Sequence, residues 1–278
     1  MTRKLRLALL AAALFMSGLA HAEIDTKVAE ELMHKAGLWD QLGQMGAQAE
    51  AGFAQRLKQS DSTATSSEAQ RASAAMGRAF GPELLRATST KVLAQNLKPE
   101  QVATLLRWFD SPQGQAVRQA EVDAAKKIVS PDASMREGRV LFDALPDARK
   151  ALLVRMVQAT RSAEFMLETS GNIAIAMMQG ARLVQPESAA VTESEIRAQL
   201  AAQRPQMLTL YAAFSIASFA TMYQDIPMET LQAYADFLES EVGRHFNDVT
   251  LQAVNAAFIQ GAKDLGQRLP GTKDASNV

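Results

Sequence analysis

Cysteine is absent from this chain of 278 residues. Without cysteine, the protein has no disulfide, no thiolate nucleophile and no thiolate metal site. A chain of this length buries enough apolar surface to fold without such cross-links. The absence therefore excludes three kinds of chemistry and does not argue against a stable fold.

Histidine is nearly as scarce, with three residues in the chain. Glu31 and His34 have the Glu-x-x-His spacing of half a di-iron carboxylate site, which puts both side chains on one helical face. A complete site needs a second such pair, and His245 instead follows Glu241 by four residues. We therefore expect an exposed helical pair, with no metal and no cofactor.

The motifs of common catalytic sites are missing as well. The sequence contains no G-x-S-x-G nucleophile elbow and no G-x-x-x-x-G-K-[ST] phosphate loop. Acids such as Asp110 and Glu239 can do acid–base chemistry, but acids near helix N-termini ordinarily stabilise the helix dipole. We therefore predict that the protein is not an enzyme. A carboxylate-dependent enzyme of the cell envelope stays as the less favoured alternative.

The chain also lacks a cluster of basic residues. Its formal net charge is −1, and it falls to −4 without residues 1–22, which hold Arg3, Lys4 and Arg6 but no acidic residue. Binding to nucleic acid depends on clustered Lys and Arg side chains that neutralise phosphates. The sequence therefore predicts no nucleic-acid partner.

The N-terminus has the three parts of a secretory signal peptide. Its basic start is followed by an apolar run, residues 7–19, that is too short to anchor stably in a bilayer core of about 30 Å. Ala20, His21 and Ala22 then form the small-x-small pattern that signal peptidase recognises. We predict cleavage after Ala22, export of the mature chain, and a protein that is not integral to the membrane.

The remaining residues predict an all-α fold. Good helix formers (Ala, Leu, Gln, Glu, Arg and Met) dominate, and alternating β-branched or aromatic runs are rare. A long uncharged stretch, residues 205–224, approaches the length of a membrane span but contains several hydroxyl side chains and two tyrosines. We expect it to form a buried central helix of a bundle.

An internal repeat is the most informative feature of the sequence. Residues 97–117 align without a gap on residues 226–246, at an offset of 129 residues. The alignment pairs Trp108 with Phe237 and keeps apolar positions, an acid, a serine and a glycine in step. Such a match predicts two tandem, duplicated helical-bundle units that share or abut a core about a pseudo-two-fold axis.

The repeat and the composition together divide the chain. We predict a signal peptide at residues 1–22, a first helical unit at 23–140, a second at 141–269 and a disordered tail at 270–278. The apolar stretch in the second unit needs extensive cover, which favours a continuous shared core over two separate ones.

Each copy of the repeat predicts a helix, a tight corner and a second helix. Ser111 is placed to cap the second helix, and Pro112 suits its first position. Gly114 removes a side chain where the two helices approach each other. The second copy has Leu238, Ser240 and Gly243 at the positions of Phe109, Ser111 and Gly114. Helix-corner chemistry explains these residues, so we predict that their role is structural.

The first corner also carries a family resemblance. Residues 109–115 (FDSPQGQ) follow a helix that begins Pro-Glu-Gln, behind a signal peptide, and this arrangement resembles the domain-of-unknown-function family twenty fifty-nine. The family usually has Tyr where this chain has Phe109, and the second copy departs further with Leu238 there and Glu241-Val242 in place of Pro-x. The resemblance implies an all-helical fold in the Gram-negative periplasm. The family has no established activity, so no catalytic residue is implied.

Two binding functions follow from what is left. The favoured one is a non-enzymatic periplasmic binding or protein-interaction module, whose partner is an unknown envelope protein. The other is a carrier of a small apolar ligand, because flexible methionine side chains can line an adaptable groove. The residues predicted to line such a groove are Met166, Met177, Met207 and Phe214. The sequence leaves the oligomeric state open.

Overall fold

The protein is helical throughout the part that the computed structural model describes. Helices account for nearly all of the described residues, and none of these residues forms a strand. The all-α fold predicted from composition is therefore confirmed. The predicted signal peptide and the predicted tail at 270–278 lie outside the described residues. The described residues are 23–59, 66–127, 131–182 and 192–266.

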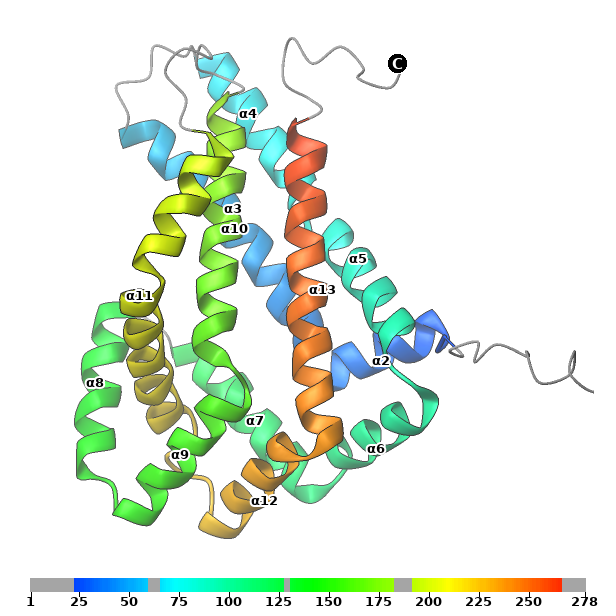
Figure 1. The fold of residues 1–278 in the computed structure, drawn as a ribbon, viewed down its shortest axis with the longest axis vertical. Helices are drawn as coiled ribbons and strands as arrows, with labels where there is room; N and C mark the ends of the chain where they lie inside the picture. Colours follow the sequence, from blue (N-terminus) through cyan, green and yellow to red (C-terminus); the bar gives the residue numbers. More distant parts are fainter. Residues whose placement is uncertain (1–22, 60–65, 128–130, 183–191, 267–278) are drawn as a thin grey trace, which may run out of the picture.

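The helices differ in length, and several long ones run side by side (Figure 1). Helices α6, α7 and α12 lie together at one end of the molecule. In chain order the helices are α2 (Thr26–Lys35), α3 (Leu38–Gln59), α4 (Ser66–Ala79), α5 (Pro82–Asn96), α6 (Pro99–Phe109), α7 (Pro112–Lys127), α8 (Pro131–Ala144), α9 (Asp147–Ala159), α10 (Ser162–Arg182), α11 (Glu193–Met222), α12 (Met228–Glu239) and α13 (Glu241–Gly266).

A first core cluster joins the N-terminal helices to the last one. Its buried residues come from α2 to α6 and from α13, which runs alongside α5 (Figure 1). Phe80 and Phe258 pack there with ring centroids 5.8 Å apart. Gly261 allows α13 to come close, because a Cβ at this position would lie 2.5 Å from the backbone oxygen of Ala79. The C-terminal helix is therefore part of the N-terminal core.

A second core cluster lies around α7, α9, α12 and the end of α11. Its buried residues include Val117, Leu153 and Tyr223. Val117 precedes residue 140, whereas Phe258 in the first cluster follows it. Each core thus draws on both sides of the boundary that the repeat predicts at residue 140.

The expected burial of residues 205–224 is wrong for the first half of that stretch. Residues 201–206 of α11 are all exposed, and Leu210 is 54% exposed. Burial is deeper near Ala217, where a Cβ on Gly138 of α8 would lie 2.2 Å from the backbone oxygen. An uncharged run has no charged face to mark the solvent side, so composition alone suggested burial. In the described part of the chain, no helix combines the length and the hydropathy that crossing a membrane requires.

Candidate functional site

The two copies of the Ser-x-x-Gly corner have the same local geometry. Ser111 Oγ donates to the carbonyl oxygen of Trp108 at 2.6 Å and accepts from the backbone N–H of Gly114 at 3.0 Å. The corresponding distances around Ser240 are also 2.6 and 3.0 Å. Each hydroxyl therefore satisfies backbone groups at the end of one helix and at the start of the next.

The two corners contact each other through aromatic rings. Trp108 and Phe237, which the repeat pairs, stack with ring centroids 4.5 Å apart and planes 8° apart. Tyr234 also stacks on Trp108, and Phe109 packs edge-on against Phe237 and Phe246. Equivalent positions touch each other where a two-fold axis passes between them. The Trp108–Phe237 contact is the one that pseudo-two-fold packing of the corners would produce.

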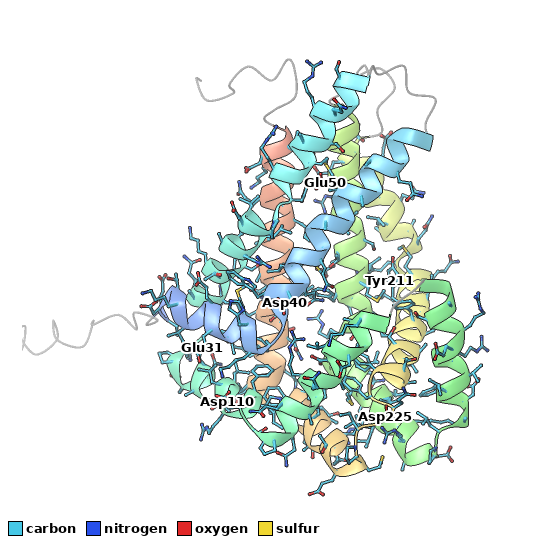
Figure 2. The ribbon with its side chains drawn as sticks, turned by 180° about the vertical axis from the view of Figure 1, so that it is seen from behind. Glu31, Asp40, Glu50, Asp110, Tyr211 and Asp225 are labelled. Atoms are coloured by element: carbon cyan, nitrogen blue, oxygen red, sulfur yellow. The ribbon has the colours of Figure 1, made fainter. Side chains whose placement is uncertain are left out.

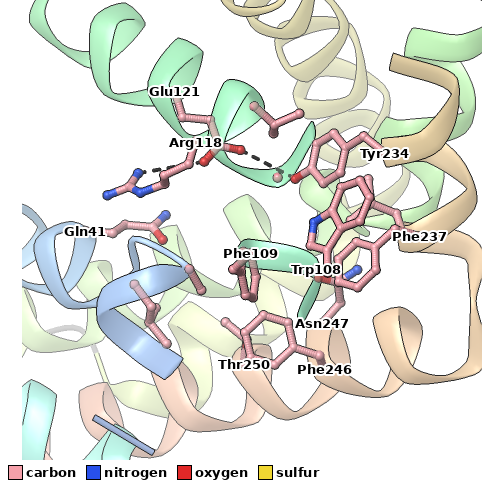
Figure 3. Close-up of a pocket in the computed structure, with 15 residues that line it drawn as sticks. Gln41, Trp108, Phe109, Arg118, Glu121, Tyr234, Phe237, Phe246, Asn247 and Thr250 are labelled. Atoms are coloured by element: carbon pink, nitrogen blue, oxygen red, sulfur yellow. Dashed lines mark hydrogen bonds and ion pairs between the residues drawn. The ribbon is translucent and has the colours of Figure 1, made fainter. Parts of the chain in front are cut away.

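A pocket of about 140 Å³ lies at this meeting of the corners. We call it the junction pocket. Figure 3 shows the rings of Trp108 and Phe237 on one side of it, with Gln41, Arg118 and Glu121 on the other. Its size is close to that of an engineered cavity of about 150 Å³ that holds benzene. The junction pocket therefore has room for one small ring with a polar substituent.

The polar side of the junction pocket is organised around Glu121 of α7. Its carboxylate accepts hydrogen bonds from the hydroxyls of Tyr223 at 3.0 Å and Tyr234 at 3.4 Å, and Arg118 Nη1 lies 3.7 Å away. Arg118 in turn pairs with Asp40 of α3 at 3.2 Å. Burial raises the pKa of Glu121, and the hydrogen bond from Tyr223 and the charge of Arg118 only partly oppose this rise. Burial also raises the pKa of both tyrosines, so their hydroxyls remain donors at neutral pH.

Replacing Glu121 by glutamine is expected to flatten the pH dependence of stability. A carboxyl group whose pKa rises on folding binds its proton more tightly in the folded state, so it favours folding at acid pH. This contribution is lost as the pH rises above the ordinary value of 4.5 and through the raised pKa of the folded state. Urea unfolding of both proteins from about pH 4 to about pH 8 measures the effect. A stability difference that stays constant over this range contradicts the raised pKa.

Thr250 of α13 adds a second polar group to the wall of the junction pocket. Its hydroxyl oxygen is buried and has no hydrogen-bond partner among the described residues. An unpaired buried hydroxyl costs about 1–3 kcal/mol, so buried polar groups usually have a partner. The hydroxyl oxygen is closed off from solvent, so it is an uncompensated cost in this wall that an apolar side chain of fitting shape would remove.

The structure brings part of the predicted corner set into the junction pocket. Phe109, Gly114 and Leu238 line it. Ser111 and Ser240 accept the cap hydrogen bonds, the second of them from the backbone N–H of Gly243. Pro112 begins α7. The polar side was missed, because no spacing in the sequence links Glu121 to Tyr223 or Tyr234, which follow it by 102 and 113 residues.

The predicted methionine groove does not coincide with the junction pocket. Met166, Met207 and Phe214 are partly buried on α10 and α11, and none of them lines the junction pocket. Met166 accepts a weak hydrogen bond from Ser215 through its sulfur at 3.7 Å. The side chain of Met177 lies outside the described part of the structure. The groove stays a prediction.

The acids considered for acid–base chemistry are engaged in ion pairs. Asp110 pairs with Lys35, and Glu239 pairs with Arg155 at 2.6 Å. Among the residues that the structure describes, no group of three or more His, Asp or Glu side chains could hold a metal ion. Figure 2 shows other acidic side chains far apart over the molecule, at Glu31, Glu50 and Asp225.

Comparison of the chain with protein-family models, with curated proteins and with solved structures gives no match in any of the three. The resemblance of the first corner to a family of secreted helical proteins therefore stays a prediction. A fold alone does not imply a function, because one fold can carry many unrelated sites. The chemistry of the junction pocket is thus the basis for a functional hypothesis.

Proposed function

We propose that this protein is a non-enzymatic binding protein of the cell envelope and that its ligand occupies the junction pocket. The observation that carries the proposal is the pairing of an aromatic wall with a carboxylate at the meeting of the two corners. Ligand sites typically combine an apolar concave surface with a few polar groups that fix orientation. Trp108 and Phe237 supply the apolar surface, and Gln41, Arg118 and Glu121 supply the polar groups.

The ligand suited to the junction pocket is a small molecule with a flat apolar body and one hydrogen-bonding end. A ring fits the volume of about 140 Å³ and packs against Trp108 and Phe237. A hydroxyl or amine on the ligand donates to the carboxylate of Glu121. Of the partners considered from the sequence, the junction pocket therefore favours a small ligand over an envelope protein.

An envelope enzyme that uses two carboxylates is less well supported. Such an enzyme places two acids about 5–9 Å apart across its substrate. Among the described residues that line the junction pocket, Glu121 is the one acid. Asp40 lies outside this lining and pairs with Arg118. The periplasmic location rests on the N-terminal sequence, which precedes the described residues.

Native mass spectrometry of the chain from residue 23 to 278, released gently from the periplasm, tests the proposal. The test compares wild type with Thr250→Met, which fills part of the junction pocket with a flexible apolar side chain. The matched control is Thr209→Met, because Thr209 is exposed on α11 and lies outside the junction pocket. Thr250→Met is expected to unfold at or above the wild-type temperature, since it removes an unpartnered buried hydroxyl.

We expect extra mass on wild type and on Thr209→Met, and the bare protein mass for Thr250→Met. The extra mass identifies the ligand class. A bare mass for folded wild-type protein counts against a resident small ligand and favours a protein partner. The same extra mass on all three proteins places the ligand outside the junction pocket.

A further inference from the structure

A second pocket, of about 360 Å³, lies beside the corner of the second copy. It is formed by α9, by the residue that precedes α10, by the end of α12 and by the start of α13. We call it the arginine pocket, because three arginines line it together with two acids. These residues are Arg155, Arg161, Arg244, Glu239 and Asp248. No residue lines both the arginine pocket and the junction pocket, although α12 and α13 contribute neighbouring residues to each.

The three arginines differ in how far their donors are already used. Arg155 donates two hydrogen bonds to the carboxylate of Glu239, from Nε at 3.0 Å and from Nη2 at 2.6 Å. Arg161 pairs with Asp248 through Nη1 at 2.8 Å and is about half exposed. Arg244 donates Nε to the backbone oxygen of Glu239 at 2.7 Å and forms no ion pair with a described residue. No hydrogen bond or ion pair with a described residue uses Nη2 of Arg161 or either Nη atom of Arg244.

Arg161 is held in a strained backbone conformation. Its φ of 51° makes it the one described non-glycine residue with positive φ. At the corner between α2 and α3 the matching position is Gly37, with φ of 75°. The two corners have the same turn, since Gly37 bonds to His34 at 3.1 Å and Arg161 bonds to Gln158 at 3.2 Å. The turn that ends α9 holds this positive φ, and glycine would adopt it with less strain, so the turn does not account for the arginine.

The positive charge is specific to the second copy. The repeat pairs Arg244 with Gln115, and both donate to the backbone oxygen five residues earlier, at 2.7 and 3.2 Å. When the sequence is aligned so that Gly37 matches Arg161, Glu31 falls at the position of Arg155. The counterparts of the three arginines are thus a glutamine, a glycine and a glutamate. Corner geometry does not require arginine at any of these positions.

We propose that the arginine pocket binds a phosphate group, with Arg161 and Arg244 as its ligands. Two guanidinium forks offer more donors than the two oxygens of one carboxylate can accept, whereas a phosphate group has enough oxygens for both. The lining holds three arginines and two acids, and Asp236, outside the lining, forms a further ion pair with Arg155 at 3.1 Å. The shared chemistry is the phosphate group, carried either by a small molecule or by a lipid headgroup. This site is independent of the function proposed for the junction pocket.

Calorimetric titration of the chain from residue 23 to 278 with inorganic phosphate, at an ionic strength kept constant with NaCl, tests the proposal. A second arm measures co-sedimentation with vesicles of phosphatidylglycerol and phosphatidylcholine, against phosphatidylcholine alone. The test variant combines Arg161→Gly and Arg244→Gln, the residues found at the matching positions of the first copy. The control is Arg107→Gln, an exposed arginine of α6 whose side chain bonds to Thr104 and forms no ion pair with a described residue.

We expect the double variant to weaken binding of phosphate, of the anionic vesicles or of both by about tenfold or more, because two charge-assisted hydrogen-bond donors are lost. Its thermal unfolding should stay close to that of wild type, since glycine relaxes the positive φ and the lost ion pair is exposed. Arg107→Gln should bind like wild type. Binding of vesicles alone assigns the phosphate to a lipid headgroup. No binding of either probe to wild type, or equal binding by the double variant, overturns the proposal.

Discussion

Replacing Gly114 by alanine is expected to destabilise the protein by about 2–4 kcal/mol. An alanine Cβ would lie 2.1 Å from the carbonyl oxygen of Trp108 and 3.1 Å from the Cα of Phe109. These obstacles are backbone atoms, so no side-chain rotation relieves the clash and the corner must open. Gly243→Ala should cost as much, because its Cβ would lie 2.1 Å from the oxygen of Phe237. Urea unfolding at neutral pH measures both losses.

Gly171→Ala in α10 is the matched control for the corner glycines. A Cβ there would meet only the Cδ1 atom of Leu200, at 3.0 Å, which belongs to a flexible side chain. Alanine is a better helix former than glycine, so this variant should be neutral or gain up to about 1 kcal/mol. If Gly114→Ala is as stable as wild type, or if Gly171→Ala loses as much stability as Gly114→Ala, the corners are less tightly packed than their geometry indicates.

The corners can be located from the sequence because their chemistry is local. Pro99 and Pro112 begin α6 and α7, and Ser111 and Gly114 take part in the cap between these helices. Each of these signals depends on residues within one or two turns of the chain. The same locality explains why helices were predictable throughout the described ranges, whereas the solvent-facing side of α11 was not.

The contents of the two pockets depend on contacts that no local pattern encodes. Glu121 meets Tyr223 only because α7 leaves the first core and packs in the second. Arg161, just before α10, and Arg244, in α13, line the same pocket although they lie far apart in the sequence. Tertiary packing determines these neighbours, so composition and periodicity could predict an absence of familiar motifs but not the sites themselves.

The relation between the two halves extends beyond the repeat that the sequence shows. The buried positions of α2 and α9 fall in step at the turns that follow them, with Ala29, Leu32 and Met33 against Leu153, Met156 and Val157. Only the apolar character of these positions is shared, and none of the three pairs is identical. This agreement supports the duplication that the repeat predicts. The arginine pocket then marks a place where the second copy differs in charge from the first.

A fragment of residues 23–140, the first predicted unit, is expected to lose the cooperative folding transition entirely. The N-terminal core buries one face of α13, including Val254, Phe258 and Leu265, and the fragment lacks that helix. Without α13, Phe80 and its neighbours would face water, and each large apolar side chain left uncovered forfeits about 1.5–3 kcal/mol. Losses of this size exceed the marginal stability of a domain, about 5–15 kcal/mol, after only a few side chains. Circular dichroism during urea unfolding tests this expectation.

Co-expression of residues 23–140 with residues 141–278 is the control for the fragment. The second piece returns α13 to the N-terminal core, while the first returns α7, with Val117, to the C-terminal core. Each piece therefore completes the other, and the pair should purify as one complex with a single unfolding transition. A cooperative transition in the fragment alone, with a denaturant dependence suited to its length, would show that the first unit folds independently and that α13 only covers it.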